Sequence, residues 1–385
     1  MSEPPRVVVI GGGLGGLCLA EGLHRAGIPV TVHERDAEPT ARRQGYRIHL
    51  GGGGATALAD CLPPASYQLL LATAGRPGGQ VTVATKRLRR LRVLPGGPGR
   101  PATSPAAVSV AVNRLTVREI MLADLGDLVR FGAEFTHYET EGAGVRAHFA
   151  NGDSVVADVL VGADGVGSRV RGQLLPHAEV VDTGNRVIYG KVLLDATTRT
   201  LLPADVKRGF LAVRAIPRPI GMALGLVEFA EPVTEAASRF GVRLTPTEDY
   251  LMFALTAPLR CFPHPDAVMS TLDGERLRET VIGMTRSWHP NLRELLAHCV
   301  VGENFHLPIR VSRPVPAWTT GPVTLLGDAV HAMSPAGGSG ANTALRDAAL
   351  LVRRLSATDR DTRLGAYERE MLDHGFAAVR VAGGR

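Results

Sequence analysis

The sequence contains few lysines and few aromatic residues, and these shortages argue against one class of partner. Lysine occurs only at Lys86, Lys191 and Lys207, so arginine carries nearly all of the positive charge behind the net charge of +6. Aromatic residues make up 5% of the chain and do not alternate with the basic ones. Proteins that bind single-stranded nucleic acid combine basic grooves with aromatic stacking platforms, so nucleic acid is not a predicted partner.

The chain also lacks long apolar runs and clustered cysteines. No apolar run is long enough to span a bilayer, and Arg6 is the only basic residue before the apolar N-terminal segment. We therefore predict a cytoplasmic protein with no signal peptide and no membrane span. The cysteines form neither a CxxC motif nor a metal-binding spacing, which predicts reduced thiols and no bound metal: Cys18, Cys61, Cys261 and Cys299.

The N-terminal segment has the pattern of a dinucleotide-binding unit. Val7–Ile10 is a continuous apolar run, as expected for a central parallel strand. The spacing GxGxxG follows at once and opens a helix, whose N-terminal N–H groups can bind a pyrophosphate. Glu34 closes the next predicted strand, where a carboxylate can accept hydrogen bonds from a ribose. This motif alone leaves both FAD and NAD possible.

A second strand and glycine-rich turn occur in the middle of the chain. The predicted strand Val155–Val161 runs into Gly162–Gly165, and Ser168 can cap the helix that follows. An Asp-Gly turn often does no more than reverse the chain, so this segment is weak evidence by itself.

The third glycine-rich turn is more specific. The short apolar strand Val323–Leu326 ends in Gly327 and Asp328, and a helix is predicted to start near Ala341. An aspartate at the end of a strand can bind a polyol hydroxyl, and the N–H groups around Gly340–Asn342 can stabilise an anion such as a reduced flavin. The three turns together indicate one large cofactor.

The three motifs resemble those of the para-hydroxybenzoate hydroxylase-like, class A FAD-dependent aromatic monooxygenases. The matching segments are GxGxxG with Glu34, GADGxxSxVR at Gly162–Arg171, and GDAxHxMxPxxGxGxN at Gly327–Asn342, and the resemblance runs from Val7 to about Leu351. It implies non-covalent FAD, NADPH or NADH as a transient reductant, and O2. The implied activity is hydroxylation of an electron-rich phenol, indole or polyketide-type aromatic through a flavin C4a-hydroperoxide.

Other activities remain open on the same scaffold. They are epoxidation, Baeyer–Villiger insertion and flavin binding without turnover. The arginine bias and the richness in alanine, glycine and proline favour a role in natural-product tailoring, such as antibiotic biosynthesis. The sequence leaves the oligomeric state open.

The resemblance also implies roles for individual residues. Glu34 would hold the adenosine ribose, Asp164 would serve the flavin and the passing nicotinamide, and Asp328 would bind the ribityl chain. No catalytic side-chain base is required, and the Pro335 loop would lie near flavin C4a; His331 is more simply a packing residue. The implied cofactor-binding residues are Gly11, Gly13, Leu14, Gly15, Gly16, Glu34, Arg35, Arg43, Arg114, Asp164, Gly165, Gly327, Asp328, Gly340, Ala341 and Asn342.

The predicted fold is α/β: a Rossmann-like FAD-binding domain, a discontinuous mixed β-sheet substrate domain and C-terminal helices. The FAD-binding domain would comprise residues 1–74, 101–182 and 272–385, and the substrate domain residues 75–100 and 183–271. The basic run Lys86–Arg100 is either a solvated hairpin edge or a surface for an anion. Gly51–Gly54 is predicted to be a flexible link. Candidate substrate contacts are Arg47, His49, Tyr189, Arg214, Met222 and Pro335.

Overall fold

The centre of the molecule is a fully parallel five-stranded sheet. A computed structural model describes residues 4–41, 46–75, 79–95, 104–357 and 363–383. The strand order is β17-β11-β1-β2-β7, and β1 and β11 are buried along their whole length because layers cover both faces of the sheet. The bounds are β1 Val7–Ile10, β2 Val30–His33, β7 Val129–Arg130, β11 Val159–Gly162 and β17 Val323–Leu325.

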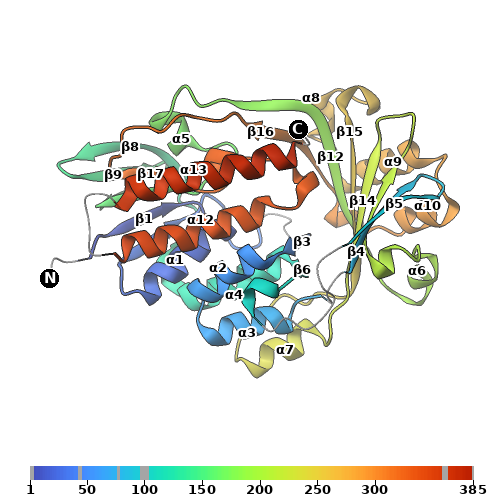
Figure 1. Ribbon diagram of the computed structural model, residues 1–385, viewed down its shortest axis with the longest axis horizontal. Helices are drawn as coiled ribbons and strands as arrows, with labels where there is room; N and C mark the ends of the chain where they lie inside the picture. The colour runs from blue at the N-terminus through green and yellow to red at the C-terminus, as the bar shows by residue number, and fades with distance from the viewer. Residues whose placement is uncertain (1–3, 42–45, 76–78, 96–103, 358–362, 384–385) are drawn as a thin grey trace.

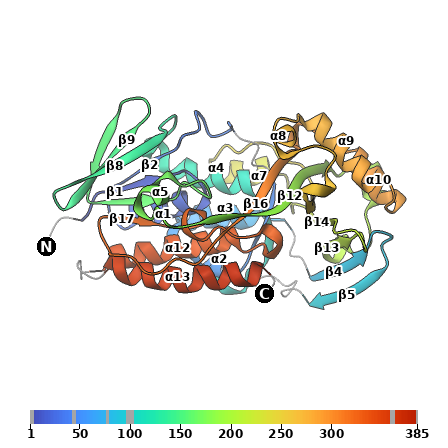
Figure 2. The ribbon, with the colours of Figure 1, turned by 90° about the horizontal axis from the view of Figure 1, so that it is seen from above.

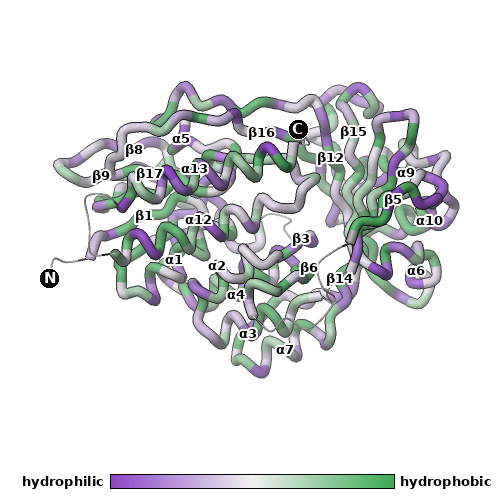
Figure 3. The backbone as a smooth tube through the Cα atoms, viewed as in Figure 1, coloured by the Kyte–Doolittle hydropathy of each residue, from purple (hydrophilic) through white to green (hydrophobic). Residues whose placement is uncertain are grey.

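Helices cover one face of this sheet and a second small sheet covers the other (Figures 1 and 2). Along α12 and α13, hydrophobic and hydrophilic residues alternate, as expected for helices with one buried face (Figure 3). The helices are α1 Leu14–Arg25, α12 Gly340–Leu355 and α13 Arg363–Ala382; the antiparallel strands are β8 Phe135–Glu141, β9 Gly144–Phe149 and β10 Ser154–Ala157.

A seven-stranded sheet stands beside this unit, at the right of Figure 1. Its order is β16-β12-β15-β14-β13-β4-β5, and all neighbours are antiparallel except β4 and β13. One face packs on a second apolar core that includes side chains of α9 and α10. The bounds are β4 Gln80–Thr85, β5 Arg90–Pro95, β12 Val180–Leu193, β13 Gly209–Arg214, β14 Gly221–Val227, β15 Tyr250–Pro258, β16 Phe305–Ser312, α9 Gly274–Thr285 and α10 Pro290–Ala297.

The remaining elements join these two sheets. A two-stranded antiparallel ladder of β3 and β6 lies between them, and α4 follows β6 directly. The bounds are β3 Arg47–Leu50, β6 Val110–Asn113, α2 Gly52–Cys61, α3 Pro64–Ala72, α4 Arg114–Leu125, α5 Arg169–Leu174, α6 Ala196–Leu201, α7 Val233–Arg239, α8 Asp266–Met269 and α11 Asp328–His331, with single 3-10 turns such as Pro335–Gly337. Among the described residues, no helix has the length and apolar character needed to cross a membrane.

The predicted α/β class with a Rossmann-like unit and C-terminal helices is confirmed. Two details differ from the prediction. The segment predicted as one strand, Val155–Val161, is two strands, β10 and β11, that belong to different sheets. The domain limits stay a prediction, and helices α9 and α10, which we assigned to the FAD-binding part, pack on the core of the seven-stranded sheet.

The run Gly51–Gly54 is the start of helix α2 and not a flexible link. Two of these glycines are needed because other chain segments come very close. A Cβ on Gly52 would lie 2.2 Å from the Ala106 carbonyl oxygen, and a Cβ on Gly54 would lie 2.3 Å from the Asn342 side-chain oxygen. Nearness in space, which local sequence does not reveal, explains Gly52 and Gly54.

The prediction that Met222 faces the cofactor is wrong. Neighbouring residues of a strand point to opposite faces. Ala223 packs with Tyr189 on the face turned toward the five-stranded unit, whereas Met222 lies in the second core between its cross-strand neighbours Val213 and Leu255. Its side chain is 2% exposed.

Met222→Ser should therefore lower the free energy of unfolding instead of altering the cofactor site. Truncating a buried methionine costs about 2–5 kcal/mol through lost apolar contacts and a cavity. Ala223→Ser, the next residue on the opposite face, should cost about 1 kcal/mol or less. Urea denaturation of the two variants checks this, and equal losses would contradict the assignment of faces.

Candidate functional site

The carboxyl ends of the parallel strands meet around one cavity of about 180 Å³. Because all strands of the central sheet point the same way, the turns after β1, β2 and β11 lie at the same edge. Several predicted cofactor residues line the cavity together: Gly11, Gly13, Glu34, Arg35, Arg114, Asp164 and Gly165. The first and second motifs, more than a hundred residues apart in sequence, therefore form one site.

The first glycine turn is shaped by close backbone contacts. Gly11 has φ of +110°, and a Cβ there would lie 2.4 Å from the Ala163 carbonyl oxygen. A Cβ on Gly16 would lie 2.1 Å from the Gly11 oxygen, while one on Gly13 would meet nothing within 4 Å. Gly13 therefore leaves an open approach to the N-terminus of α1, which suits a pyrophosphate. Leu14 is buried, and a Cβ on Gly15 would crowd the Leu326 side chain. These two residues therefore serve the packing of α1.

Glu34 is held in place by the backbone of its own site. One carboxylate oxygen accepts a hydrogen bond from Gly12 N at 2.8 Å, and the other accepts one from Asp36 N at 3.0 Å. The side chain is buried and lines the cavity beside the glycine turn. A carboxylate has about four acceptor sites, so Glu34 can also receive ribose hydroxyls.

Helix α4 supplies two arginines one turn apart. Asn113 caps the helix by accepting hydrogen bonds from the next N–H groups, which places Arg114 at the cavity with its guanidinium 5.7 Å from the Tyr46 ring centre. Arg118 is 1% exposed, and its Nε donates to the Gly12 oxygen at 3.0 Å. Arg118 was not among the predicted cofactor residues, although its i, i+4 spacing from Arg114 places both on one face of the helix.

Asp164 lines the cavity and also caps helix α5. Its carboxylate accepts hydrogen bonds from Ser168 Oγ at 2.5 Å and from Arg169 N at 2.8 Å. Ser168 Oγ accepts one from Arg171 N at 2.9 Å, so the predicted cap is confirmed. Burial raises the pKa of Asp164 above its usual value, although these hydrogen bonds act in the opposite direction.

Behind the third turn lies a buried network of charged side chains centred on Asp347. Its carboxylate accepts a hydrogen bond from Gly327 N at 2.8 Å and pairs with His331 Nε2 and with His374 Nε2, each at 2.6 Å. Asp347 and His331 are fully buried. His331 is thus a packing and pairing residue behind the turn. Neither Asp347 nor His374 belongs to a motif, and only the apolar residues around them mark these positions as buried.

The network changes the pKa of both main partners. Burial acts against the charged form of His331, but the Asp347 carboxylate outweighs it, so the pKa of His331 is raised. Burial likewise acts against ionised Asp347, and the two histidines outweigh it, so the pKa of Asp347 is lowered. We therefore treat His331 and Asp347 as an ion pair.

Asp328 is the first residue of α11 and lies beside the N-terminus of α12. Its side chain is exposed, yet desolvation raises its pKa, while the positive charges of His331 and Arg114 oppose that rise. A Cβ on Gly340, the first residue of α12, would lie 3.9 Å from the Asp328 carboxylate. Asp328 therefore lies next to the α12 N-terminus and within electrostatic reach of Arg114.

Asn342 fixes the start of α12 against the β3–α2 turn. Its Nδ2 donates to the His49 oxygen at 2.7 Å, and its Oδ1 accepts from Gly51 N at 2.9 Å. Ala341 lies in the same first turn, half-buried, and Pro335 is exposed in the loop before it. These two hydrogen bonds join the loop predicted to lie at flavin O2 to the glycine run at 51–54.

Aromatic groups of the seven-stranded sheet and a basic group of β3 meet where that sheet packs against this unit. Tyr189 stacks on Phe305 at 5.2 Å between ring centres and on Tyr46 at 5.5 Å. Arg47 Nε donates to the Leu226 oxygen at 3.3 Å, and its guanidinium lies over Phe210. Burial lowers the pKa of Arg47, and among the described residues no carboxylate pairs with it.

The other predicted residues are placed as follows. Burial, and then the charge of Arg47, lowers the pKa of His49. Arg214 is exposed on the same strand face as Ala212.

The basic run Lys86–Arg100 includes β5, which is the outermost strand of its sheet. Arg90 of this strand pairs with Asp205 at 2.7 Å, as for a hairpin edge. Arg43 and residues 96–100 lie outside the described residues.

Comparison with known proteins agrees with this geometry. A family model described as FAD binding domain matches residues 303–382, and one described as NAD(P)-binding Rossmann-like domain matches residues 9–67. The chain is 32% identical over 377 residues to a dual O-methyltransferase/FAD-dependent monooxygenase of Phaeosphaeria nodorum, covering 91% of this chain. It spans only 40% of the length of that relative.

Two further relatives match along almost their whole length. The 6-hydroxynicotinate 3-monooxygenase of Pseudomonas fluorescens is 28% identical over 390 residues, which is 99% of this chain and 91% of that protein. A solved structure from Photorhabdus luminescens, classed as an FAD-containing monooxygenase, has a TM-score of 0.82 and 29% identity and covers 98% of this chain and 96% of that one.

The fold and the site therefore define an FAD-binding flavoprotein, with FAD as its cofactor. More narrowly, the chain is similar in sequence and in fold to FAD-dependent monooxygenases, in agreement with the family that its motifs resemble. The residues of this site fit the cofactor: an open helix N-terminus for the pyrophosphate, a carboxylate at the first turn and another at the third.

Asp347→Asn should destabilise the protein strongly, because it leaves the buried His331 without its counter-charge. Breaking a buried ion pair costs about 3–5 kcal/mol. The pKa of His331 is raised above the usual histidine value of about 6.5. The contribution of protonated His331 to stability is therefore complete below about pH 6.5 and is lost as pH rises through the folded pKa. The lowered pKa of Asp347 means a second loss as pH falls through its folded pKa, well into the acid range.

The measurement is the free energy of unfolding in urea near pH 6 and again near pH 8. Glu370→Gln, which breaks an exposed pair with Arg354, is the matched control and should cost about 1 kcal/mol or less. A loss for Asp347→Asn no larger than that of the control would contradict the buried ion pair.

Proposed function

We propose that this chain is an NAD(P)H- and O2-dependent monooxygenase that hydroxylates an electron-rich aromatic small molecule. The observation that carries this proposal is the position of an aromatic cluster beside the FAD site. Tyr189 and Phe305 of the seven-stranded sheet stack with Tyr46, the residue before β3. The Tyr46 ring centre lies 5.7 Å from the guanidinium of Arg114, which lines the cofactor cavity. The names of two relatives support the reaction class. One is a 6-hydroxynicotinate 3-monooxygenase, and the other is a dual O-methyltransferase/FAD-dependent monooxygenase.

The protein would hold FAD along the shared edge of the strands. The N-terminus of α1 at Gly13 would bind the pyrophosphate, Glu34 the adenosine ribose and Asp328 the ribityl hydroxyls. The first N–H groups of α12, at Ala341 and Asn342, would stabilise negative charge on the flavin ring, because they are fixed before the reaction. When bound, FAD supplies the redox chemistry: it accepts hydride from NAD(P)H, activates O2 and transfers one oxygen atom.

The substrate would lie between the flavin and the seven-stranded sheet. Stacking on the Tyr189 cluster favours a planar aromatic ring. Arg47 is a desolvated cation without a paired carboxylate among the described residues, so it would attract a phenolate or carboxylate of the substrate. The aromatic side chains of the Tyr189 cluster would also keep water from the reacting atoms. A phenol, indole or polyketide-type ring with an acidic group fits these features, as in natural-product tailoring.

The experiment is a substrate screen with the FAD-loaded protein. Aromatic acids and phenols should accelerate NAD(P)H oxidation, whereas saturated analogues with the same acidic group should not. With labelled O2, the product should gain one labelled oxygen on an aromatic carbon. A lactone or epoxide product would favour the alternative oxygen insertions. If no aromatic compound accelerates NAD(P)H oxidation, the protein is a flavin-binding protein without this activity.

A further inference from the structure

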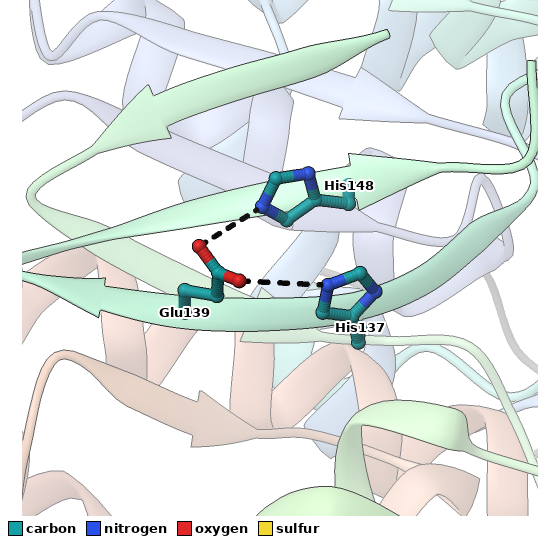
Figure 4. Close-up of side chains that lie close together, drawn as sticks. All are labelled: His137, Glu139 and His148. Carbon is teal, nitrogen blue, oxygen red and sulfur yellow. Dashed lines mark ion pairs between the residues drawn. The ribbon is translucent and has the colours of Figure 1, made fainter. Parts of the chain in front are cut away.

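Two histidines and a glutamate gather on the sheet formed by β8, β9 and β10 (Figure 4), and none of the three lines the cofactor cavity. His137 on β8 lies directly opposite His148 on β9, and Glu139 lies two residues further along β8 on the same face. The Glu139 carboxylate is 3.5 Å from His148 Nε2 and 3.9 Å from His137 Nε2. One donor atom from each residue lies within 4.8 Å of the others.

Hydrogen bonding around His137 prepares its Nε2 as a ligand. The Thr136 hydroxyl donates to the His148 carbonyl oxygen at 3.0 Å, and a carbonyl can only accept. The His137 Nδ1, 3.1 Å from the same hydroxyl, must therefore be the donor in that second contact. This arrangement puts the proton on Nδ1 and leaves a lone pair on Nε2, as a metal requires. Thr136 lies at a bulge of β8, which brings its hydroxyl to this position.

The other two groups are also available. His148 Nε2 is shielded from solvent and has no hydrogen-bond partner among the described residues. Arg146 lies opposite Glu139 in the strand register, but its guanidinium pairs with Glu141 at 2.9 Å and not with Glu139. Within the part of the chain that the structure describes, the Glu139 carboxylate therefore faces the two imidazoles and pairs with no arginine.

We propose that His137, Glu139 and His148 bind a divalent transition-metal ion such as Zn²⁺. Two imidazole nitrogens and one carboxylate oxygen are a preferred Zn²⁺ donor set, with a fourth position for water. A tetrahedral ion with bonds of about 2.1 Å holds its ligand atoms about 3.4 Å apart. The two carboxylate–imidazole distances, 3.5 Å from one Glu139 oxygen and 3.9 Å from the other, are close to this value.

Binding requires one small movement. The two imidazole rings are stacked with centres 4.5 Å apart and planes 5° apart, so their lone pairs do not converge. His137 is 53% exposed, so its ring can rotate out of the stack toward a shared ion. The ion would join β8 to β9 close to Phe135, which lines the cofactor cavity. It would act as a structural link and take no part in oxygen transfer.

The test is calorimetric titration of the tag-free, FAD-loaded protein with Zn²⁺, together with the visible spectrum of the Co²⁺ form. We expect one ion per chain. His137→Gln and Glu139→Gln should each weaken binding at least about tenfold, since a lost ligand should cost no less than a lost supporting contact. His177→Gln, an exposed histidine of the same unit, is the matched control and should bind as wild type does.

Thermal unfolding without metal shows whether the variants are folded, and Zn²⁺ should raise the midpoint for the wild type and for His177→Gln only. The proposal is overturned if the wild type shows no saturable binding, or if folded His137→Gln and Glu139→Gln bind Zn²⁺ as tightly as the control. Neither result depends on the proposed monooxygenase activity.

Discussion

The site depends first on the close backbone contact between the ends of β1 and β11. A side chain at Gly11 would collide with the Ala163 carbonyl, and one at Gly16 would collide with Gly11 itself. Only with glycine at these positions can the first turn, the second turn and the start of α1 share one edge of the sheet. Two hydrogen bonds also hold Gly12 within the turn: its N–H donates to Glu34, and its carbonyl oxygen accepts from Arg118. The close packing of these two strand ends thus shapes the cavity, and the N-terminus of α1 lies at its edge.

The third turn is supported by charge, not by glycine alone. Asp347 holds Gly327 N–H and two histidines inside an otherwise apolar region between α11, α12 and α13. A buried network of this kind stabilises only while all of its members are paired, so it gives the turn one fixed arrangement. Asn342 does the same on the other side by binding the β3–α2 turn. Hydrogen bonds within the protein therefore hold the segment whose N–H groups would face the flavin.

Local sequence predicted the parts of the site that depend on local rules. The strand–glycine–helix units, Glu34, the Ser168 cap and the position of Asp328 after β17 follow from spacing and propensity, and the structure has them in place. It did not predict Arg118, Asp347 or the reason for Gly51–Gly54, because their partners lie far away in the chain. Met222 was placed on the wrong face because a period of two identifies two faces of a strand and does not say which one meets the cofactor.

One FAD molecule spanning the first and third turns is the central claim, and the two ends of the cofactor can be tested separately. Asp328→Ala should lose a charged hydrogen bond worth about 1.5–3 kcal/mol, which weakens FAD binding roughly ten- to hundredfold. ADP, which lacks the flavin and the ribityl chain, should bind this variant as tightly as the wild type. The measurement is the Kd of FAD and of ADP for both proteins. Unchanged FAD affinity, or an equal loss for ADP, would contradict the placement of Asp328 at the ribityl chain.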